Sequence, residues 1–568
     1  MQSLQQHINK IAEIFFRIGG DTAVICPGSR DVPLILAFTR HKKIKCIPIT
    51  DERSAGFIAL GVAQQTQKPV ALICTSGTAI LNFYPALCEA FYQQIPLVVI
   101  TADRPPEFID QWDGQAIRQN EVFKNHILKQ ITIPHSLDEG SMQAIEMEVC
   151  ETLILGKQQK LPVHINVPLR EPFYPALNEN YDYDFSPLEA EPPSLLPLHY
   201  SALDEYEMKV TLRQIHEVGA AQKSLKLLVV IGMNHFTDDI LVAVKKAQQS
   251  LHFPVIADVI SNYISDDLLA NYDFILDTNN KLPQLIPDIL ITMGGPVLSK
   301  NLKKFIRSNK PIMHLHIQAF GHVGNPFHSL SSILRVAPER FFEALSNEPL
   351  EVSKYFDAWK IEAVKMNTQK EIAKLPFCEL KAAHIVFNSI PSQSNLQLAN
   401  SMAVRYALLF DIDATIKVNS NRGTSGIDGC SSTAVGAAIT TPKLTTLITG
   451  DIAFFYDVNA YWNTLKLPNL HIVILNNGGG GIFRLIEGPS ALNELEEFIE
   501  NAHSRTAEFI AKDFKLSYKK VTTEEELRTA LPLFFQEDQR LKVLEIFTDK
   551  YENEKGYKSF KTSMSSHV

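Results

Sequence analysis

Two apolar runs in the last third of the chain each end in a residue whose side chain suits a divalent cation. TTLITG is followed by Asp451, and HIVILN is followed by Asn477 and four glycines. In open α/β sheets, ligands bind beyond the carboxyl ends of the strands, and carboxylate, amide and carbonyl oxygens suit Mg²⁺. Glycines let backbone N–H groups approach a phosphate closely. The two strand ends therefore indicate a metal that bridges a diphosphate, although Asp451 could instead cap a helix and Asn-Gly could mark a turn.

A third strand-end carboxylate lies near the N-terminus. In IPITDERSAGFIALG, Asp51 and Glu52 follow a β-rich run and precede a helix-like segment that is rich in small residues. Either carboxylate could merely favour the helix N-terminus through the helix dipole. Alternatively, Glu52 could face a ligand, and it becomes the strongest catalytic candidate if the glycine-rich segment binds a diphosphate. No GxGxxG sequence follows a strand, so a dinucleotide site is not supported.

These residues need a scaffold of strands and helices, and the chain shows three blocks of that kind. Apolar, β-branched runs alternate with helical patterns, which is typical of βαβ units. We therefore predict an α/β protein of three consecutive doubly wound parallel-sheet domains, at 1–180, 181–350 and 351–568. A Pro-rich, acidic stretch near 172–205 is predicted to be a linker. In the second block, DFILD (273–277) is predicted to be a strand.

The composition limits the classes of partner. The 568-residue chain has a net charge of −9, so it has no overall attraction for nucleic acid or anionic membranes. Its seven cysteines form no CxxC pair and several lie in apolar runs, which favours a reducing compartment. The N-terminal segment lacks an apolar signal region, and no apolar run approaches the roughly 18 residues of a membrane span. We predict a soluble, cytoplasmic protein without a membrane span or a nucleic-acid partner.

The GD and NN sequences at the two strand ends resemble the metal motif of thiamine-diphosphate enzymes. Ile452 stands where that motif has its third glycine, which removes a flexible position but no ligand. By this resemblance, Mg²⁺ (or Mn²⁺) is held against the diphosphate of thiamine diphosphate by Asp451, Asn477 and the carbonyl group of Gly479. The resemblance also implies that Glu52 hydrogen-bonds a nitrogen of the cofactor's aminopyrimidine ring. It implies the fold of that enzyme class as well, with pyrimidine-binding, central and diphosphate-binding domains in this order.

Six motifs narrow the resemblance. CPGSR, TDERSAGF, CTSGTA, TADRP, SNRGTSGIDG and NNGGGGIF occur in this order and together resemble the 2-succinyl-5-enolpyruvyl-6-hydroxy-3-cyclohexene-1-carboxylate synthases of menaquinone biosynthesis. The resemblance implies that 2-oxoglutarate is decarboxylated and that the succinyl carbanion/enamine adds to isochorismate, with release of CO₂. It also implies a homodimer or homotetramer with active sites between subunits. The alternatives are another thiamine-dependent 2-oxoacid carboligase or decarboxylase, such as an acetolactate synthase, and a non-catalytic nucleotide- or diphosphate-binding regulator.

Dicarboxylate substrates require clustered cationic side chains on an acidic protein, and arginine suits bidentate binding of carboxylates. By resemblance, the substrate-binding residues are Ser29, Arg30, Arg104, Gln115, Lys300, Ser401, Arg405 and Arg422, with Ile482 and Phe483 as an apolar wall. Ile427 matches the bulky residue that props the cofactor in its bent conformation, although it could be an ordinary core residue. Gly114 stands where some relatives have Asn. No motif contributes a histidine, so proton transfers are expected to involve the cofactor, Glu52 and ordered water.

Overall fold

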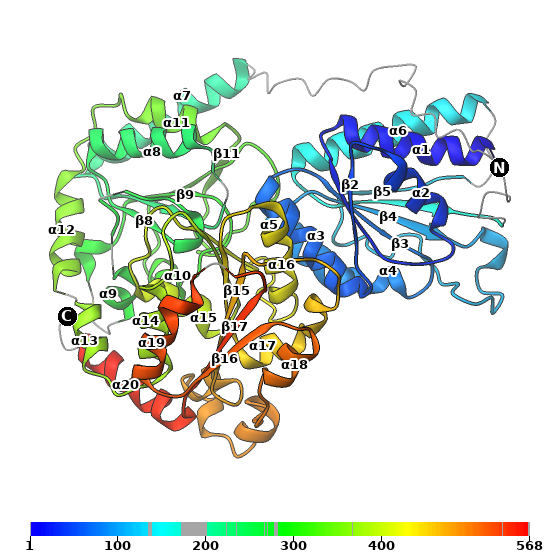
Figure 1. The fold of residues 1–568 in the computed structure, drawn as a ribbon. Coiled ribbons are helices and arrows are strands. Elements are labelled where there is room, and N and C mark those ends of the chain that lie inside the picture. The colour runs from blue at the N-terminus through cyan, green and yellow to red at the C-terminus, as the bar shows by residue number, and fades with distance from the viewer. Residues whose placement is uncertain are drawn as a thin grey trace.

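Three parallel β-sheets, one in each third of the chain, form the framework of the molecule (Figure 1). The computed structural model describes residues 2–134, 139–171, 202–222, 224–234, 236–265, 267–269, 271–277, 282–365, 367–536 and 538–565. Helices pack on the sheets, as βαβ connections require, and most strands are buried. The predicted α/β fold class with three parallel-sheet domains is confirmed. The boundaries at 180/181 and 350/351 remain predictions.

The first sheet has the strand order β2-β1-β3-β4-β6-β5. Its strands are β1 (Thr22–Ile25), β2 (Lys45–Pro48), β3 (Val70–Cys74), β4 (Leu97–Asp103), β5 (Lys129–Thr132) and β6 (Val163–Pro168). Its helices are α1 (Gln2–Arg17), α2 (Val32–Arg40), α3 (Glu52–Thr66), α4 (Ala79–Asn82), α5 (Tyr84–Gln93) and α6 (Glu139–Gln159). The chain runs from the central strand β1 to β2 and then crosses to β3. That reversal is the switch point at which doubly wound sheets bind ligands.

The second sheet has the order β11-β10-β9-β7-β8. Its strands are β7 (Leu227–Ile231), β8 (Val255–Ala257), β9 (Ile289–Met293), β10 (Met313–Ile317) and β11 (Ser332–Leu334). The helices of this part are α7 (Ala202–Ala221), α8 (Asp238–Leu251), α9 (Tyr272–Asp277), α10 (Lys300–Ser308) and α11 (Pro338–Leu345). Two further helices, α12 (Ser353–Val364) and α13 (Thr368–Ala373), lead to the third sheet.

The third sheet, in the order β13-β12-β14-β15-β17-β16, repeats the winding of the first. Its strands are β12 (Asn395–Leu398), β13 (Lys417–Ser420), β14 (Thr445–Gly450), β15 (Leu470–Asn476), β16 (Ser517–Val521) and β17 (Lys542–Phe547). Its helices are α14 (Glu379–Phe387), α15 (Met402–Tyr406), α16 (Cys430–Thr440), α17 (Asp451–Tyr456), α18 (Glu508–Asp513), α19 (Glu524–Phe534) and α20 (Lys550–Ser565). Single turns of 3₁₀ helix are η1 (Pro106–Phe108), η2 (Val259–Ser261), η3 (Pro283–Leu285), η4 (Ala407–Leu409), η5 (Val458–Tyr461), η6 (Gly481–Arg484) and η7 (Pro489–Ala491), and η8 (Leu495–Ile499) is a short π-helix.

The structure corrects the sequence prediction in the second and third blocks. DFILD is not a strand: it lies within helix α9, which packs against α10 and begins directly after Asn271. Strands β5, β11 and β16 were missed because each lies at the edge of its sheet and contains polar or exposed residues. Residues 172–201 of the linker predicted near 172–205 lie outside the described residues, and its last four residues belong to α7, which begins at Ala202.

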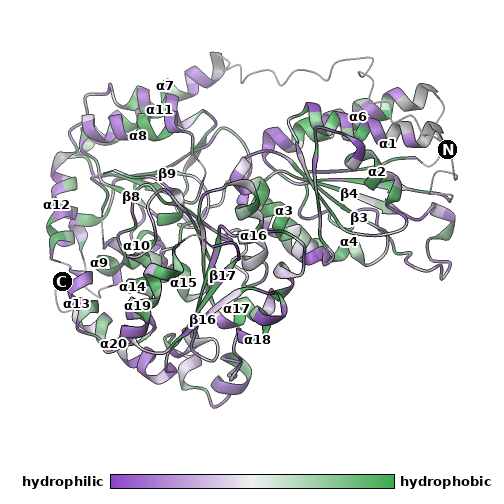
Figure 2. Cartoon of the chain, in the orientation of Figure 1, coloured by the Kyte–Doolittle hydropathy of each residue, from purple (hydrophilic) through white to green (hydrophobic). Residues whose placement is uncertain are grey.

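Helices α3 and α16 join the first and third parts of the chain (Figure 1). Both are apolar along the contact (Figure 2), and one hydrophobic core includes residues from both. At their crossing, a Cβ atom on Gly61 would overlap the Thr433 carbonyl oxygen, and one on Gly436 would overlap the Ile58 carbonyl oxygen. The two glycines therefore permit backbone-to-backbone packing at a spot that no side chain can enter.

Gly436→Ala is accordingly expected to lower the free energy of unfolding, by about 1–3 kcal/mol, through overpacking. The higher helix propensity of alanine offsets only about 1 kcal/mol of the overlap. Urea titration followed by circular dichroism measures the change. Gly324→Ala is the matched control, because a Cβ atom at Gly324 meets nothing within 4 Å. Equal midpoints for the two variants would show that the crossing can relax around a methyl group.

Candidate active site

The Asp451 carboxylate organises the glycine-rich loop. Asp451 begins α17 directly after β14, and Gly478 follows the neighbouring strand β15. One carboxylate oxygen accepts hydrogen bonds from the backbone N–H groups of Gly478 (2.8 Å) and Gly479 (3.0 Å), and the other accepts from Ile452 N–H (2.7 Å). Gly478 has φ +76°, a conformation that favours glycine. Asp451 thus binds an N–H group in the first turn of α17 and fixes the loop at the same time.

Asn477 provides the second oxygen of this group. Its Nδ2 donates to the Oε2 atom of Glu379 (2.5 Å), whereas its Oδ1 is buried and has no hydrogen-bond partner among the described residues. Burial, and then the nearby Glu379 carboxylate, raise the pKa of Asp451 to about 7. An unpartnered amide oxygen beside a buried carboxylate fits a hard divalent cation, whose charge would offset the cost of that burial. The donor set therefore agrees with the predicted metal.

A segment after the glycine loop holds the loop from the other side. Gly480 N–H donates to the Glu500 carbonyl oxygen (2.6 Å), and His503 N–H donates to the Gly478 carbonyl oxygen (2.8 Å). The buried Glu500 side chain is paired with Arg484 (2.6 Å). His503 also places its Nε2 3.5 Å from the Asp451 carboxylate. The glycine loop is therefore held by hydrogen bonds to Asp451 and to the backbone of Glu500 and His503.

The predicted substrate residues of the third part lie on neighbouring turns. Ser401 precedes α15 with φ +72°, and its carbonyl oxygen accepts a hydrogen bond from Arg405 (2.6 Å). Arg422 donates to the side-chain oxygen of Asn400 (2.9 Å), while its Nε is buried without a partner among the described residues. Adjacent placement of these polar groups agrees with an anion-binding role. Three apolar candidates remain partly exposed near this region, namely Ile427, Ile482 and Phe483.

Helix α10 of the second part adds further positive charge. Lys300 is exposed at its first position, and Lys303 lies one turn later. Burial lowers the pKa of Lys303, and the charges of Arg422, Arg307 and Lys300 lower it further, against the opposite effect of Asp258. Lys303 therefore lies close enough to Arg422 for their charges to interact, between the second and third domains.

The predicted residues of the first part all follow strands of the first sheet. Asp51, not Glu52, caps α3: its carboxylate accepts from the N–H groups of Arg53 (2.8 Å) and Ser54 (3.2 Å). Glu52 is half-buried, and burial together with the Asp51 charge raises the pKa of its carboxyl group. The capping function that sequence left open for Glu52 therefore belongs to its neighbour. This leaves the Glu52 carboxyl group available for a ligand.

The remaining first-domain candidates lie in the loops that follow β1 and β4. Arg30 is 5% exposed and donates to the Leu169 carbonyl oxygen (2.5 Å), whereas Ser29 is exposed. Arg104 donates to the Gly114 carbonyl oxygen (2.5 Å). The exposed Gln115, with φ +56°, packs over Gly77 in the loop after β3. Gly114 thus contacts Arg104 through its backbone carbonyl oxygen, and this contact needs no side chain at position 114.

We call Glu52 and the other first-domain candidates the pyrimidine-side group, and Asp451, Asn477 and Gly479 the diphosphate-side group, after their predicted roles. No hydrogen bond or ion pair among the described residues joins Glu52 to Asp451, Asn477 or Gly479. At the start of α3, the N-cap residue Asp51 accepts a hydrogen bond from Asn459 (2.6 Å), and Arg53 donates one to the Tyr456 carbonyl oxygen (2.8 Å). The hydrogen bonds between the start of α3 and the third domain therefore do not involve the predicted metal ligands.

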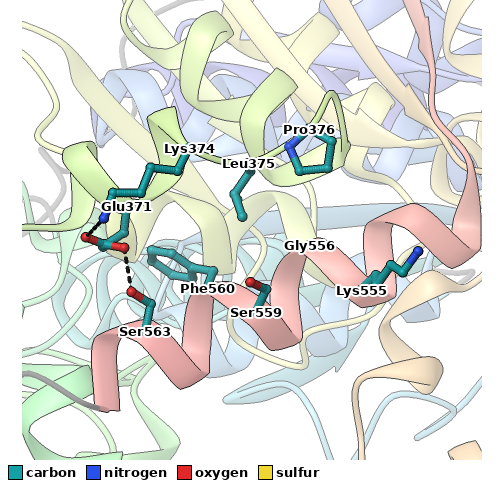
Figure 3. Close-up of a pocket in the computed structure, with 9 residues that line it drawn as sticks. All are labelled: Glu371, Lys374, Leu375, Pro376, Lys555, Gly556, Ser559, Phe560 and Ser563. Carbon is teal, nitrogen blue, oxygen red and sulfur yellow. Dashed lines mark hydrogen bonds and ion pairs between the residues drawn. The ribbon is translucent and has the colours of Figure 1, made fainter.

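A surface cavity of about 460 Å³ lies elsewhere, between the end of α13 and helix α20 (Figure 3). Leu375 and Phe560 point into it, and Glu371 pairs with Lys374 (2.6 Å) and accepts from Ser563 (2.5 Å). None of the predicted site residues lines this cavity. This cavity therefore lies away from the strand ends that carry the predicted site residues.

Similarity to known proteins shows the family of this chain. Residues 9–127 match the family described as thiamine pyrophosphate enzyme, N-terminal TPP binding domain. Three similar proteins bear the name 2-succinyl-5-enolpyruvyl-6-hydroxy-3-cyclohexene-1-carboxylate synthase. That of Cytophaga hutchinsonii is 39% identical over 98% of this chain and 99% of the relative, and that of Flavobacterium johnsoniae is 38% identical over 96% of each. That of Bacteroides thetaiotaomicron is 35% identical over 97% of each. The chain belongs to this synthase family.

Family membership confirms the resemblance drawn from the six motifs. The matched N-terminal region contains Glu52 and the other first-domain candidates, and the similarity to the synthases extends across the diphosphate-side group. Sequence reasoning missed Glu379, Lys303 and His503, which contact or approach the predicted residues but lie outside the motifs. The charge pattern of α10 was the signal that could have indicated Lys303. Glu379 and His503 had no local signal.

Gly479→Val is expected to weaken binding of thiamine diphosphate by about tenfold or more, equal to about 1.4 kcal/mol. A Cβ atom at Gly479 would lie 3.0 Å from both the Cγ and the carbonyl oxygen of Glu500, so the loop must shift. Isothermal titration with the cofactor in excess Mg²⁺ measures the effect. Gly324→Val, in open space, is the control. Unchanged affinity in Gly479→Val would separate this loop from the cofactor.

Proposed function

We propose that this protein is a thiamine-diphosphate-dependent synthase of menaquinone biosynthesis. It removes CO₂ from 2-oxoglutarate and joins the remaining succinyl unit to isochorismate, giving 2-succinyl-5-enolpyruvyl-6-hydroxy-3-cyclohexene-1-carboxylate. The observation that carries the proposal is the unpartnered Asn477 oxygen beside the buried Asp451 carboxylate. It occurs in a chain that belongs to the synthase family.

The residues divide the work between the two groups. Asp451, Asn477 and the Gly479 carbonyl group would hold Mg²⁺ or Mn²⁺, and the Ile427 side chain would support the cofactor from the apolar side. Bound thiamine diphosphate supplies the electron sink for decarboxylation and carbon–carbon bond formation. Glu52 would hold a proton at a nitrogen of the pyrimidine ring, a role favoured by the raised pKa of its carboxyl group.

The cationic side chains account for the choice of substrates. Arg405, Arg422 and Lys300 of the second and third domains would bind carboxylates of the dianionic substrates. Arg30, Arg104, Ser29 and Gln115 would serve the same purpose on the pyrimidine side. Ser401 would contribute a polar contact, and the flanking apolar residues Ile482 and Phe483 would exclude water. A decarboxylase for pyruvate needs no such number of cations.

The resemblance to thiamine-diphosphate enzymes implies a homodimer or homotetramer, and no hydrogen bond joins the two groups among the described residues. A second copy would bring its pyrimidine-side group to the diphosphate-side group of the first, which completes an active site between subunits. We further propose that the protein acts in the cytoplasm without a nucleic-acid partner. In the described part of the chain, no helix is both long and apolar enough to span a membrane.

A carboligation assay tests the function. The protein is incubated with 2-oxoglutarate, isochorismate, thiamine diphosphate and Mg²⁺, and the product is identified by mass spectrometry while CO₂ release is followed. We expect product only in the complete mixture and none when the cofactor is omitted. Product from pyruvate in place of 2-oxoglutarate would favour the acetolactate-synthase alternative. Cofactor binding without CO₂ release from either acid would favour a non-catalytic regulator.

A further inference from the structure

Glu379 is a buried carboxylate that no sequence motif contains. It begins α14 and is 3% exposed. Its Oε2 accepts a hydrogen bond from Asn477 Nδ2 (2.5 Å), and its Oε1 accepts one from the Tyr406 hydroxyl (3.1 Å). In the described structure, no lysine, arginine or histidine forms an ion pair with it. A buried carboxylate without a cationic partner is costly, so a specific reason for its position is required.

The first reason lies in the chemistry of the asparagine amide. One end of the Asn477 side chain can only donate and the other can only accept, whereas an ionised carboxylate can only accept. Glu379 therefore stabilises the orientation in which Nδ2 faces it and Oδ1 faces away. A flip of the amide would place two acceptors against each other. The Oδ1 atom, which has no partner among the described residues, is thereby kept free for a ligand.

The second reason lies in the position of Tyr406. It is the last residue of α15, the short helix that carries Arg405 and follows Ser401. Glu379 thus bridges the helix of the predicted substrate residues to the predicted metal ligand 98 residues away in the chain. The glycine loop confines the same amide, because a Cβ atom on Gly481 would lie 2.7 Å from Asn477 Nδ2. The amide is therefore held by its partner and by its surroundings.

We propose that Glu379 is a positioning residue for the metal site: it orients the Asn477 amide so that Oδ1 binds the divalent cation. The inference rests on the proposed function, since it assumes that Asp451, Asn477 and Gly479 bind the metal. Glu379 contacts neither metal nor substrate itself. It acts through Asn477, as outer carboxylates do that fix the orientation of metal-binding side chains.

The test compares metal affinity in the full-length protein with thiamine diphosphate bound. Mn²⁺ is titrated into the protein, and the concentration of free Mn²⁺ is measured by electron paramagnetic resonance. Glu379→Gln is expected to weaken Mn²⁺ binding by about 10–100-fold, because the glutamine amide can present a donor to Asn477 and permit the flip. Glu379→Asp, which keeps the charge but shortens the reach, is expected to weaken it too. Tyr406→Phe keeps the Asn477 contact, so its Mn²⁺ affinity should fall much less.

A double-mutant cycle separates positioning from general destabilisation. Once Asn477→Ala has removed the amide, Glu379→Gln should have little further effect on Mn²⁺ affinity, whereas a purely structural defect would add to the loss. Circular dichroism of each variant reports folding independently. Wild-type Mn²⁺ affinity in folded Glu379→Gln or Glu379→Asp, or additive losses in the cycle, would overturn the inference. If the wild type makes no product but the Glu379 variants still lose Mn²⁺ binding, the proposed function is refuted and the positioning role of Glu379 stands.

Discussion

Glu52→Gln is expected to reduce turnover by about 10²–10⁴-fold, the range that a positioned acid–base group contributes. Glutamine has the shape of the carboxyl group but cannot exchange a proton with the pyrimidine nitrogen of the cofactor. The variant should therefore bind the cofactor and both substrates yet turn over slowly. Steady-state rates of product formation, with cofactor affinity measured in parallel, separate the two effects.

The structure makes this substitution unusually clean. Asp51 caps α3 through Arg53 and Ser54, so the start of the helix does not depend on Glu52. Removing the charge of a half-buried carboxyl group, whose pKa burial already raises, should leave the fold intact. Glu525→Gln is the matched control, because it makes the same chemical change at an exposed residue in the first turn of α19. Full activity in Glu52→Gln would remove Glu52 from the mechanism.

Asp451→Asn is expected to abolish metal-dependent binding of the cofactor, with an affinity loss of about 100-fold or more, equal to about 2.7 kcal/mol. The carboxylate accepts three backbone N–H groups, from Ile452, Gly478 and Gly479. An amide nitrogen in place of one oxygen cannot accept these bonds, and a buried N–H group that loses its partner costs about 1–3 kcal/mol. The glycine loop should therefore loosen at the same time as the metal ligand loses its charge.

Calorimetric titration of thiamine diphosphate with and without Mg²⁺ measures the loss. In the wild type, affinity should rise on addition of Mg²⁺, whereas in Asp451→Asn the two curves should nearly coincide. Asp457→Asn is an informative comparison, because Asp457 is equally buried at the other end of α17 but holds Ser432 instead of the glycine loop. An undiminished Mg²⁺ effect in Asp451→Asn would place the metal elsewhere.

Local sequence patterns predicted much of this protein. Alternating apolar runs and helical patterns were enough to predict three parallel α/β domains, because buried strands and amphipathic helices each have a characteristic pattern of apolar residues over a short segment. The motifs placed Asp451, Asn477 and Glu52 at strand ends, where the structure has them. Strands β5, β11 and β16 escaped prediction because the side chains of an edge strand need not be apolar. The strand predicted for DFILD was wrong because five apolar or acidic residues fit a short buried helix as well as a strand.

Contacts between distant parts of the chain were decided only by the tertiary structure. The hydrogen bond of Glu379 to Asn477 and the crossing of α3 and α16 join segments with no shared local pattern. The capping of α3 by Asp51 instead of Glu52 depended on side-chain directions that spacing left open. Sequence by itself therefore determined the fold class, the family and the residue types of the site. Only packing determined which of those residues touch, since such contacts depend on how whole elements fit together in space.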